Sequence, residues 1–292
     1  MLVTTLPIPQ PLLLTAEPLT PAAFSPFGAV LTNPAPDIRP SAVTPQNISQ
    51  TLPPATGAVS ANQGSAIQYR ALAPPLRNLY AQAPSRKPAE PRTTMFVCGA
   101  RELAPDPDPG LQVHRRGKGK GKGRGKGPAD SRDGGLFQVS ILERHPFTTQ
   151  TFVPVGAGAE ARYLVIVAPS LAPDQSTIPS DVDEKNLCAP MGPGLPGRGL
   201  PDLTRVRAFV ATGAQAVTYG AGTWHAPMAA LGPAGSAIDF VVVQFANDEP
   251  VEDCQEVALE GSSNGGAIKG EEADSVRIMV RVPPSRIRHS KL

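Results

Sequence analysis

The sequence has few of the residues that disulfide-rich domains, zinc-thiolate sites and large aromatic cores need. Aromatic residues make up 5% of the 292 residues, with one tryptophan and four histidines. Cys98, Cys188 and Cys254 are too far apart for a zinc-thiolate motif, and three cysteines cannot all pair. This cysteine usage excludes a disulfide-stapled fold, and we expect an intracellular protein of a reducing compartment with one core of modest size.

Long hydrophobic runs and helical periodicity are also scarce. No stretch approaches the roughly 20 apolar residues of a membrane-spanning helix. Prolines interrupt the apolar stretch MLVTTLPIPQPLLL, which has no basic residues before it, so a secretory signal is not expected. One short helix is expected near residues 21–24. We therefore expect a soluble protein with no membrane association.

Proline and glycine are abundant, with 35 and 28 residues, and their clusters divide the chain. Repeated prolines exclude regular helices and central strands from most of the N-terminal part. The expected organisation is a Pro-rich segment at 1–60 that is partly ordered at 15–33, a single domain at 62–258 with insertions at 102–135 and 170–204, and a tail at 259–292 with one late strand.

Basic residues are concentrated in the run RRGKGKGKGRGKG, residues 115–127. The formal net charge is +2, but this run holds seven of the 27 Lys and Arg, which leaves 20 of them against 25 Asp and Glu elsewhere, a balance of −5. Such a run can hold nucleic-acid phosphates by charge alone. It contains no aromatic residues to stack on bases, so a disordered, solvated insertion is the preferred interpretation. An RNA-binding, non-catalytic barrel stays as an alternative.

Short apolar runs that alternate with polar residues predict a series of strands. The expected strands are at 95–101, 136–142, 150–155, 163–169, 206–210, 216–220, 238–246 and 275–282. The runs YLVIV and FVVVQF are rich in β-branched residues and are expected to be buried on both faces. Many short strands and few helices predict a mainly β sandwich or barrel.

Two stretches carry residues suited to chemistry. In LERHPFTTQTFVP, residues 142–154, Glu143 and His145 are two apart and point to one face of a strand. Gln150 follows a turn opened by proline and can return to that face on the next strand. In YGAGTWHAP, residues 219–227, glycines allow a tight turn before His225. The joint spacing indicates an active site inside a small antiparallel barrel.

This spacing resembles the two-motif pattern of cupin barrels, in which His-x-His and a later Glu are followed by Gly-x-x-His. Here the positions are Glu143, His145, Gln150 and His225. The resemblance implies a double-stranded β-helix, a cupin-like barrel, with long disordered insertions. Those positions hold a metal in most cupins. Here Glu and Gln replace a His and a Glu, which weakens a tight transition-metal site. No cofactor is therefore certain, and a divalent ion on these four residues stays an open alternative.

Four ordered blocks resemble the ureidoglycolate lyase family, particularly its fungal form. They are NQGSAIQY, LERHPFTTQTFVP, PDLTRVRAFVATGAQAVTYGAGTWHAPM and DFVVVQFANDEPVEDCQE. The resemblance covers about residues 15–33 and 62–258. It implies a carbon–nitrogen lyase that cleaves ureidoglycolate to glyoxylate and urea in allantoin and purine catabolism, and it implies a homodimer.

This substrate carries a carboxylate, a hydroxyl and a ureido group on one carbon, so the reaction needs a cation, a base and an acid. The expected catalytic residues are His145 and His225, with Glu143 as an alternative base or orienting group. The expected substrate-binding residues are Arg144 or another barrel arginine for the carboxylate, Gln150 and Tyr219 for the ureido group or hydroxyl, and Trp224 as a wall. A metal-dependent cupin oxygenase or isomerase that uses the same positions is the competing enzyme hypothesis.

The last three residues, Ser290, Lys291 and Leu292, match a peroxisomal address that a receptor reads. A basic, proline-bearing stretch precedes them. We therefore expect a peroxisomal enzyme, with an ordinary cytoplasmic enzyme as the alternative.

Overall fold

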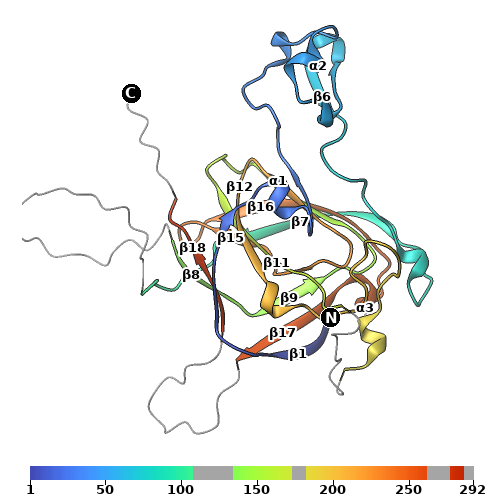
Figure 1. Cartoon of the computed structure of the whole chain (residues 1–292), viewed down its shortest axis with the longest axis vertical. Helices are drawn as coiled ribbons and strands as arrows, with labels where there is room; N and C mark the ends of the chain where they lie inside the picture. Colours follow the sequence, from blue (N-terminus) through green and yellow to red (C-terminus); the bar gives the residue numbers. More distant parts are fainter. Residues whose placement is uncertain (108–133, 173–181, 262–276, 286–292) are drawn as a thin grey trace, which may run out of the picture.

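Two β-sheets that face each other form the body of the protein, and a third, smaller sheet covers the back of the larger one (Figure 1). The computed structural model describes residues 1–107, 134–172, 182–261 and 277–285. The mainly β prediction is confirmed. The basic run 115–127 lies outside the described residues.

The largest sheet has the order β1-β17-β9-β14-β11-β12-β3, with β15 paired to β11. Its strands are β1 (Leu2–Ile8), β17 (Gln255–Gly261), β9 (Ile141–Arg144), β14 (Trp224–His225), β11 (Arg162–Ala168), β12 (Arg207–Thr212), β3 (Glu17–Pro18) and β15 (Ala229–Leu231).

The facing sheet has five strands in the order β4-β13-β10-β16-β7. They are β4 (Gly28–Leu31), β13 (Ala216–Tyr219), β10 (Gln150–Val155), β16 (Ala237–Ala246) and β7 (Glu90–Gly99). The third sheet contains β2 (Leu12–Thr15), β18 (Ile278–Val282) and β8 (Gly135–Val139).

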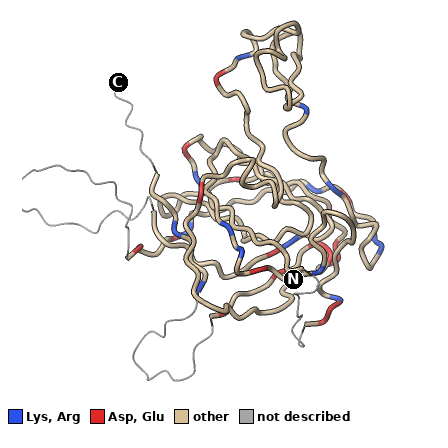
Figure 2. The backbone as a smooth tube through the Cα atoms, in the orientation of Figure 1, with Lys and Arg blue, Asp and Glu red and all other residues tan. Residues whose placement is uncertain are grey.

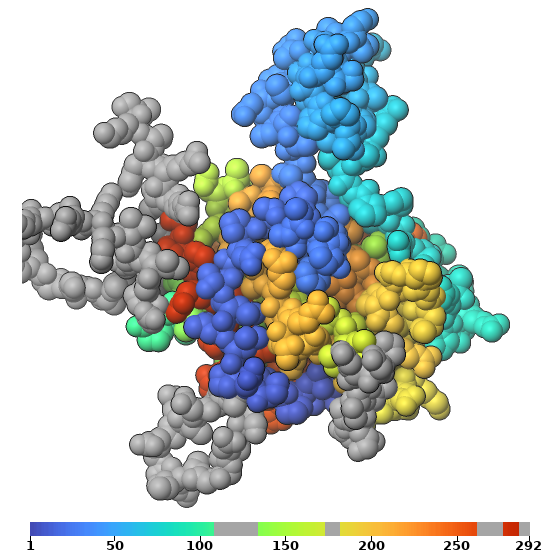
Figure 3. All heavy atoms as spheres, viewed as in Figure 1, coloured from blue at the N-terminus to red at the C-terminus, as the bar shows by residue number. Residues whose placement is uncertain are grey.

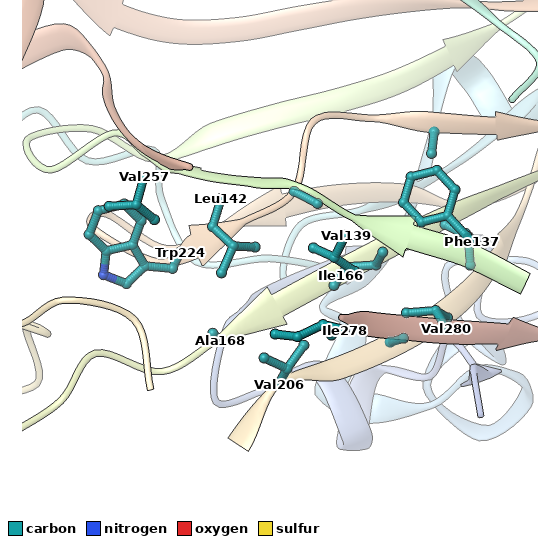
Figure 4. Close-up of a cluster of buried hydrophobic side chains, with 14 of the residues drawn as sticks. Phe137, Val139, Leu142, Ile166, Ala168, Val206, Trp224, Val257, Ile278 and Val280 are labelled. Carbon is teal, nitrogen blue, oxygen red and sulfur yellow. The ribbon is translucent and has the colours of Figure 1, made fainter. Parts of the chain in front are cut away.

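Strand β11 is buried on both faces, as the run YLVIV predicted. Tyr163, Val165 and Val167 face the five-stranded sheet and pack in one core cluster. Leu164 and Ile166 point the other way, into a second cluster with the third sheet (Figure 4). The largest sheet is therefore the middle layer, and successive residues on its strands enter different cores.

The N-terminal segment contributes more to the fold than its prolines predict. Strand β1 pairs in parallel with β17, and β2 pairs in parallel with β18. Pro7 fits in β1 because β1 is the edge strand of its sheet, where a missing N–H is tolerated. The segment 1–60 was expected to be ordered only at 15–33, and the strands Leu2–Ile8 and Leu12–Thr15 correct that expectation.

The expected helix is present as α1 (Pro21–Phe24), where the Thr20 side chain accepts a hydrogen bond from the N–H of Ala23 and proline occupies the first turn. The other α-helices among the described residues, α2 (Ile48–Thr51) and α3 (Pro250–Asp253), are equally short. None of the described helices has the length and apolar character to cross a membrane.

The two predicted insertions and the tail differ in how far they are described. Much of the second insertion is described and packed: Leu187 and Leu200 are buried in the core next to the third sheet, which corrects the expectation of a disordered loop there. Most of the first insertion, 108–133, lies outside the described residues. Strand β18 of the tail is fully integrated, since Ile278 and Val280 have no exposed surface.

Residues 34–72 form a small unit, called the arm below, that stands clear of the barrel on two chain segments (Figures 1 and 3). It contains α2 and a hairpin of β5 (Ala58–Ala61) and β6 (Ala66–Tyr69), whose strands pair only with each other. Its hydrophobic cluster, around Val43, Ile48 and Leu52, consists of arm residues alone.

Candidate active site

Two strand registers bring four of the predicted residues together. His225 on β14 lies opposite Glu143 on β9 in the largest sheet. Gln150 on β10 lies opposite Tyr219 on β13 in the facing sheet. The two motifs, about 80 residues apart in the sequence, therefore meet between the sheets, as their spacing predicted.

The turn before His225 depends on one glycine. Gly222 has φ 76°, in the left-handed region, and its N–H donates to the carbonyl of His145 at 2.8 Å. A Cβ at this position would lie 2.7 Å from Cγ of Pro196, so a larger residue is excluded by both space and backbone. Gly222 thus links the two motifs directly.

A cavity of about 430 Å³ lies beside these residues. Its lining includes catalytic and polar candidates, two thiols and an apolar rim, namely Arg92, Thr94, Phe96, Cys98, Glu143, His145, Gln150, Phe152, Pro227, Met228, Gln244, Ala246, Asp253 and Cys254. A second cavity, of about 420 Å³, is lined by Arg77, Thr149 and Thr223 among others and contains none of the predicted site residues.

His145 is held through its Nδ1, which lies 2.6 Å from the carbonyl oxygen of Asp253. This contact makes Nδ1 the donor in the neutral ring and leaves an electron pair on Nε2. Nε2 is buried and has no hydrogen-bond partner among the described residues. Burial, together with the nearby His225, lowers the pKa of His145 to about 4. His145 is therefore a neutral imidazole near pH 7, with its basic nitrogen unused.

The residue that holds His145 is itself fixed by a polar network at α3. The Asp253 carboxylate accepts hydrogen bonds from the Tyr80 hydroxyl at 2.6 Å and from the backbone N–H of Asn247 and Asp248. Burial and hydrogen bonding to Asp253 raise the pKa of Tyr80, so its hydroxyl stays protonated and donating. The network positions the Asp253 carbonyl and, through it, the imidazole of His145.

His225 has a similar arrangement. Its Nδ1 lies 2.9 Å from the carbonyl oxygen of Thr223, and its ring stacks on Tyr219 with centroids 3.9 Å apart and planes at 11°. Nε2 of His225 lies 3.5 Å from Oε1 of Glu143, within ion-pair range but without a well-aligned hydrogen bond. The two imidazole rings are 5.6 Å apart between centroids.

Glu143 is partly buried beside both imidazoles. Burial raises its pKa, but His225 and His145 lower it by more, so the net pKa lies below the ordinary value. Its side chain keeps 20% of its surface exposed. Glu143 is thus a carboxylate near neutral pH that can share a proton with His225.

Glu143, His145 and His225 also have the composition of a metal site. One ligand atom from each lies within 4.8 Å of the other two. Two imidazoles and one carboxylate can hold a borderline divalent ion such as iron, nickel or zinc, and the unpartnered Nε2 atoms fit that use. A cation bound there would supply Lewis-acid polarisation. Gln150, the fourth predicted ligand, lines the same cavity.

Gln150 is paired with a residue that the sequence analysis missed. Its Nε2 donates to Oε1 of Gln244 at 2.7 Å, and its own Oε1 is buried without a partner among the described residues. Gln244 could have been found, because it is the one polar residue in the run FVVVQFA and occupies an inward position on β16.

Arg144 and Trp224 point to the opposite side of the middle sheet and do not line the cavity, which corrects their assignment to substrate binding. The Arg144 guanidinium lies 4.5 Å from the Trp224 ring and donates hydrogen bonds to Gln255, Gly197 and Gly199. Trp224 is fully buried with Leu142 (Figure 4), and its Nε1–H donates to Gly199 at 3.0 Å. The reason is strand alternation: Arg144 lies between Glu143 and His145, which line the cavity, and Trp224 precedes His225, which lies opposite Glu143.

Tyr219 also lies behind the cavity wall, where it stacks on His225. Its hydroxyl is buried without a hydrogen-bond partner among the described residues, and burial raises its pKa well above the ordinary value. Its position suits orientation of His225 and does not suit direct contact with a ligand in the cavity. Cys254 lines the cavity as a thiol, because burial raises its pKa to about 12.

Comparison with known proteins gives one consistent family. A family model described as ureidoglycolate lyase matches residues 11–264. The ureidoglycolate lyase of Schizosaccharomyces pombe is 42% identical over 120 residues, which are 41% of this chain and 48% of that protein. The ureidoglycolate lyase of Saccharomyces cerevisiae is 40% identical over 122 residues, 40% of this chain and 49% of that protein.

A bacterial relative, the ureidoglycolate lyase of Burkholderia mallei, is 34% identical over 112 residues, 38% of this chain and 46% of that protein. The chain thus spans about half the length of the curated relatives it matches. The family model nevertheless covers the arm, both chemical motifs and the sheets of the barrel except strands β1 and β18. The chain therefore belongs to the ureidoglycolate lyase family.

Proposed function

We propose that this protein is a ureidoglycolate lyase, a carbon–nitrogen lyase that releases glyoxylate and urea. The observation that carries the proposal is the pair of buried, unpartnered Nε2 atoms of His145 and His225 beside Glu143, at a cavity in a chain of this family. Buried polar atoms without partners are costly, and at a cavity wall they indicate a ligand that completes them.

His145 has the properties of the general base. Its neutral ring presents the Nε2 electron pair toward the cavity, and its low pKa keeps it unprotonated near pH 7. Removal of the hydroxyl proton of the substrate by Nε2 lets the C–O bond become the aldehyde carbonyl of glyoxylate, while the C–N bond to the ureido group breaks.

His225 and Glu143 together can act as the general acid. A proton shared between Nε2 of His225 and the Glu143 carboxylate, 3.5 Å apart, can pass to the departing ureido nitrogen, which leaves as urea. One proton is thus taken from the hydroxyl and one is given to the nitrogen, so the reaction is balanced without an external oxidant or reductant.

The amides of Gln150 and Gln244 suit recognition of the ureido group. The free Oε1 of Gln150 can accept a hydrogen bond from a ureido N–H, and the Gln150–Gln244 bond fixes its orientation. An amide oxygen held in this way favours a ligand with N–H donors over one with a hydrophobic group.

The metal-dependent oxygenase or isomerase is the second candidate, and the composition of the Glu143, His145 and His225 cluster favours it. The RNA-binding hypothesis rests on residues 115–127, outside the described part of the chain. Deletion of residues 115–127 distinguishes the two hypotheses, since the lyase proposal predicts unchanged turnover and the RNA-binding hypothesis predicts loss of RNA binding.

The deciding experiment incubates the purified protein with ureidoglycolate and quantifies glyoxylate and urea, with and without chelator, in air and without oxygen. Equal release of both products in the absence of oxygen supports the lyase. Activity that disappears without oxygen contradicts it, and activity that disappears with chelator alone assigns the cation a role in the lyase.

We further propose that the facing sheets form a cupin-like double-stranded β-helix and that the protein is a homodimer. Support for the dimer comes from β7, an edge strand that exposes Met95 at 56%, Phe96 at 47% and Val97 at 69%. Exposed apolar residues on a sheet edge are typical of a protein interface. Sedimentation of the full chain tests the dimer.

The peroxisomal location also stays a proposal. It rests on Ser290, Lys291 and Leu292, which lie outside the described residues. An N-terminal fluorescent tag tests it: a diffuse cytoplasmic signal that is the same with and without these three residues contradicts the address.

A further inference from the structure

The arm buries little apolar surface of its own. Its 39 residues bury three hydrophobic side chains, and chains of this size need disulfides, metals or association with another surface. It contains no cysteine, and none of the candidate metal clusters among the described residues lies in it. Association with another surface would bury more apolar area and stabilise it.

The outward face of the arm hairpin carries an unpaired cation. Ile67 and Tyr69 of β6 pack against the arm's own cluster, whereas Gln68 and Arg70 are exposed. Arg70 donates from Nε to the Gln68 amide oxygen at 3.1 Å, and no carboxylate pairs with it in the described structure. Charged residues are sparse on the arm (Figure 2), so Arg70 is a distinct feature of this face.

The barrel cavity lacks this feature. Arg92 is the one Arg or Lys side chain among its lining residues, and its guanidinium is engaged by the carboxylate of Asp248. Arg144 points away from the cavity and is bonded to Gln255. A substrate carboxylate in the cavity would therefore meet no unengaged guanidinium of the same barrel.

The rim of the cavity is also uncovered on one side. Phe96 lines the cavity and is 47% exposed, and Met95 and Val97 extend the apolar surface along the free edge of β7. Charged groups bound at an active site need to be shielded from water for strong electrostatic interactions. In the described part of the chain, the cavity therefore lacks a cover and a free guanidinium, and the arm of the same chain has an exposed face that carries one.

We propose that in a homodimer the outward face of the β5–β6 hairpin covers the partner's cavity beside β7 and that Arg70 binds the substrate carboxylate there. The site is then composite: His145, His225 and Gln150 come from one protomer and Arg70 comes from the other. A guanidinium fork matches a carboxylate in two parallel hydrogen bonds, which fixes the orientation of the substrate. The inference rests on the proposed function and on the proposed dimer.

Arg70→Ala should raise KM at least about tenfold, with a smaller effect on kcat, because a charge-assisted hydrogen bond to the substrate is lost. Arg39→Ala is the matched control, since Arg39 is the other exposed arginine of the arm and donates to its neighbour Pro36. Its kinetics should match those of the native protein.

The decisive experiment combines one chain that has a raised KM with one chain that has lost turnover. Arg70→Ala and His145→Ala chains carry different tags, are expressed together, and are isolated as heterodimers by sequential affinity steps. At substrate concentrations below KM, the heterodimer has one intact composite site and should recover about half of the native activity. An arm that serves its own barrel leaves both sites defective, so a heterodimer with no more than about a twentieth of the native activity overturns the proposal.

A second readout does not depend on turnover. Gln68→Cys places a thiol on the outward face of the hairpin, and Cys98 is a native thiol of the cavity. A short bismaleimide should link the two into a covalent dimer that Cys98→Ser abolishes. Absence of this dimer overturns the composite site even if lyase activity is present, whereas its formation in a protein without lyase activity would contradict the proposed function alone.

Discussion

The two faces of strands β9 and β14 differ in function: one face lies toward the candidate active site and the other packs in a hydrophobic core. Glu143 and His145 line the cavity, His225 lies beside them with its Nε2 3.5 Å from Glu143, and both imidazoles keep an Nε2 without a hydrogen-bond partner among the described residues. Arg144 and Trp224, the residues next to them in the sequence, face the opposite core, where their side chains donate to Gly199 and other carbonyls. Arg144 keeps Nη2 without a partner among the described residues, but its Nε and Nη1 are hydrogen-bonded in the core. Unpaired imidazole nitrogens beside a cavity indicate ligand binding, whereas hydrogen bonds in a core indicate stability.

The largest expected effect lies on the core face. Arg144→Met should destabilise the protein by about 3–5 kcal/mol, because Gln255, Gly197 and Gly199 lose their buried donor. Turnover per folded molecule should stay close to native. Urea unfolding and active-site titration check both parts, and a stable Arg144→Met protein with a large kinetic defect would reverse the assignment of the two faces.

On the cavity face, His145→Ala should lower kcat at least about a hundredfold, as expected for removal of an acid/base group. The free energy of unfolding should change less than for Arg144→Met, because the ring makes one hydrogen bond. Turnover and urea unfolding on the same preparation test this. Near-native turnover of a folded variant would remove His145 from the mechanism.

The low pKa of His145 predicts acid sensitivity of the fold. At pH 5 the unfolded chain protonates this histidine, with its ordinary pKa of 6.5, while the folded chain, with a pKa of about 4, does not. The contribution of neutral His145 to the free energy of unfolding is complete above pH 6.5 and is lost as the pH falls toward 4. The free energy of unfolding should therefore be about 2 kcal/mol smaller at pH 5 than at pH 7. His145→Gln should lose this part of the pH dependence, measured by urea unfolding in the presence of chelator.

The smallest effect is expected at the amide pair. Gln244→Ala frees Nε2 of Gln150 and should raise KM about tenfold with little change in stability, since one net hydrogen bond is worth about 1 kcal/mol. Steady-state kinetics of both Gln244→Ala and Gln244→Glu check this prediction. The Glu variant shows whether an accepting oxygen at position 244 is sufficient to hold Gln150. An unchanged KM in both variants would exclude the pair from substrate recognition.

Much of the fold was predictable because short-range patterns determine it. The predicted strand 150–155 has the same bounds as β10, and the run YLVIV is buried on both faces as predicted. The N-terminal strands β1 and β2 were not predictable, because they are defined by parallel pairing with β17 and β18, more than 240 residues away in the chain. Proline content describes local preference and does not report such distant partners.

The site was predictable where two residues share a strand face and unpredictable where distant elements contribute. The two-residue spacing of Glu143 and His145 placed both on one side. The same alternation places Arg144 in the core, although a guanidinium is chemically suited to bind a carboxylate. The Asp253 carbonyl, which fixes His145, had no signal because a backbone group carries no side-chain identity.

Adjacent residues on β14 provide the most direct test of the account. His225→Ala and Trp224→Phe are compared for glyoxylate and urea release from ureidoglycolate at equal concentrations of folded protein. The account predicts that His225→Ala loses at least about a hundredfold in turnover and that Trp224→Phe keeps near-native turnover with reduced stability. Near-native turnover of His225→Ala, or an equal kinetic loss in the two variants with native-like folding, would contradict the separation of a catalytic face from a core face.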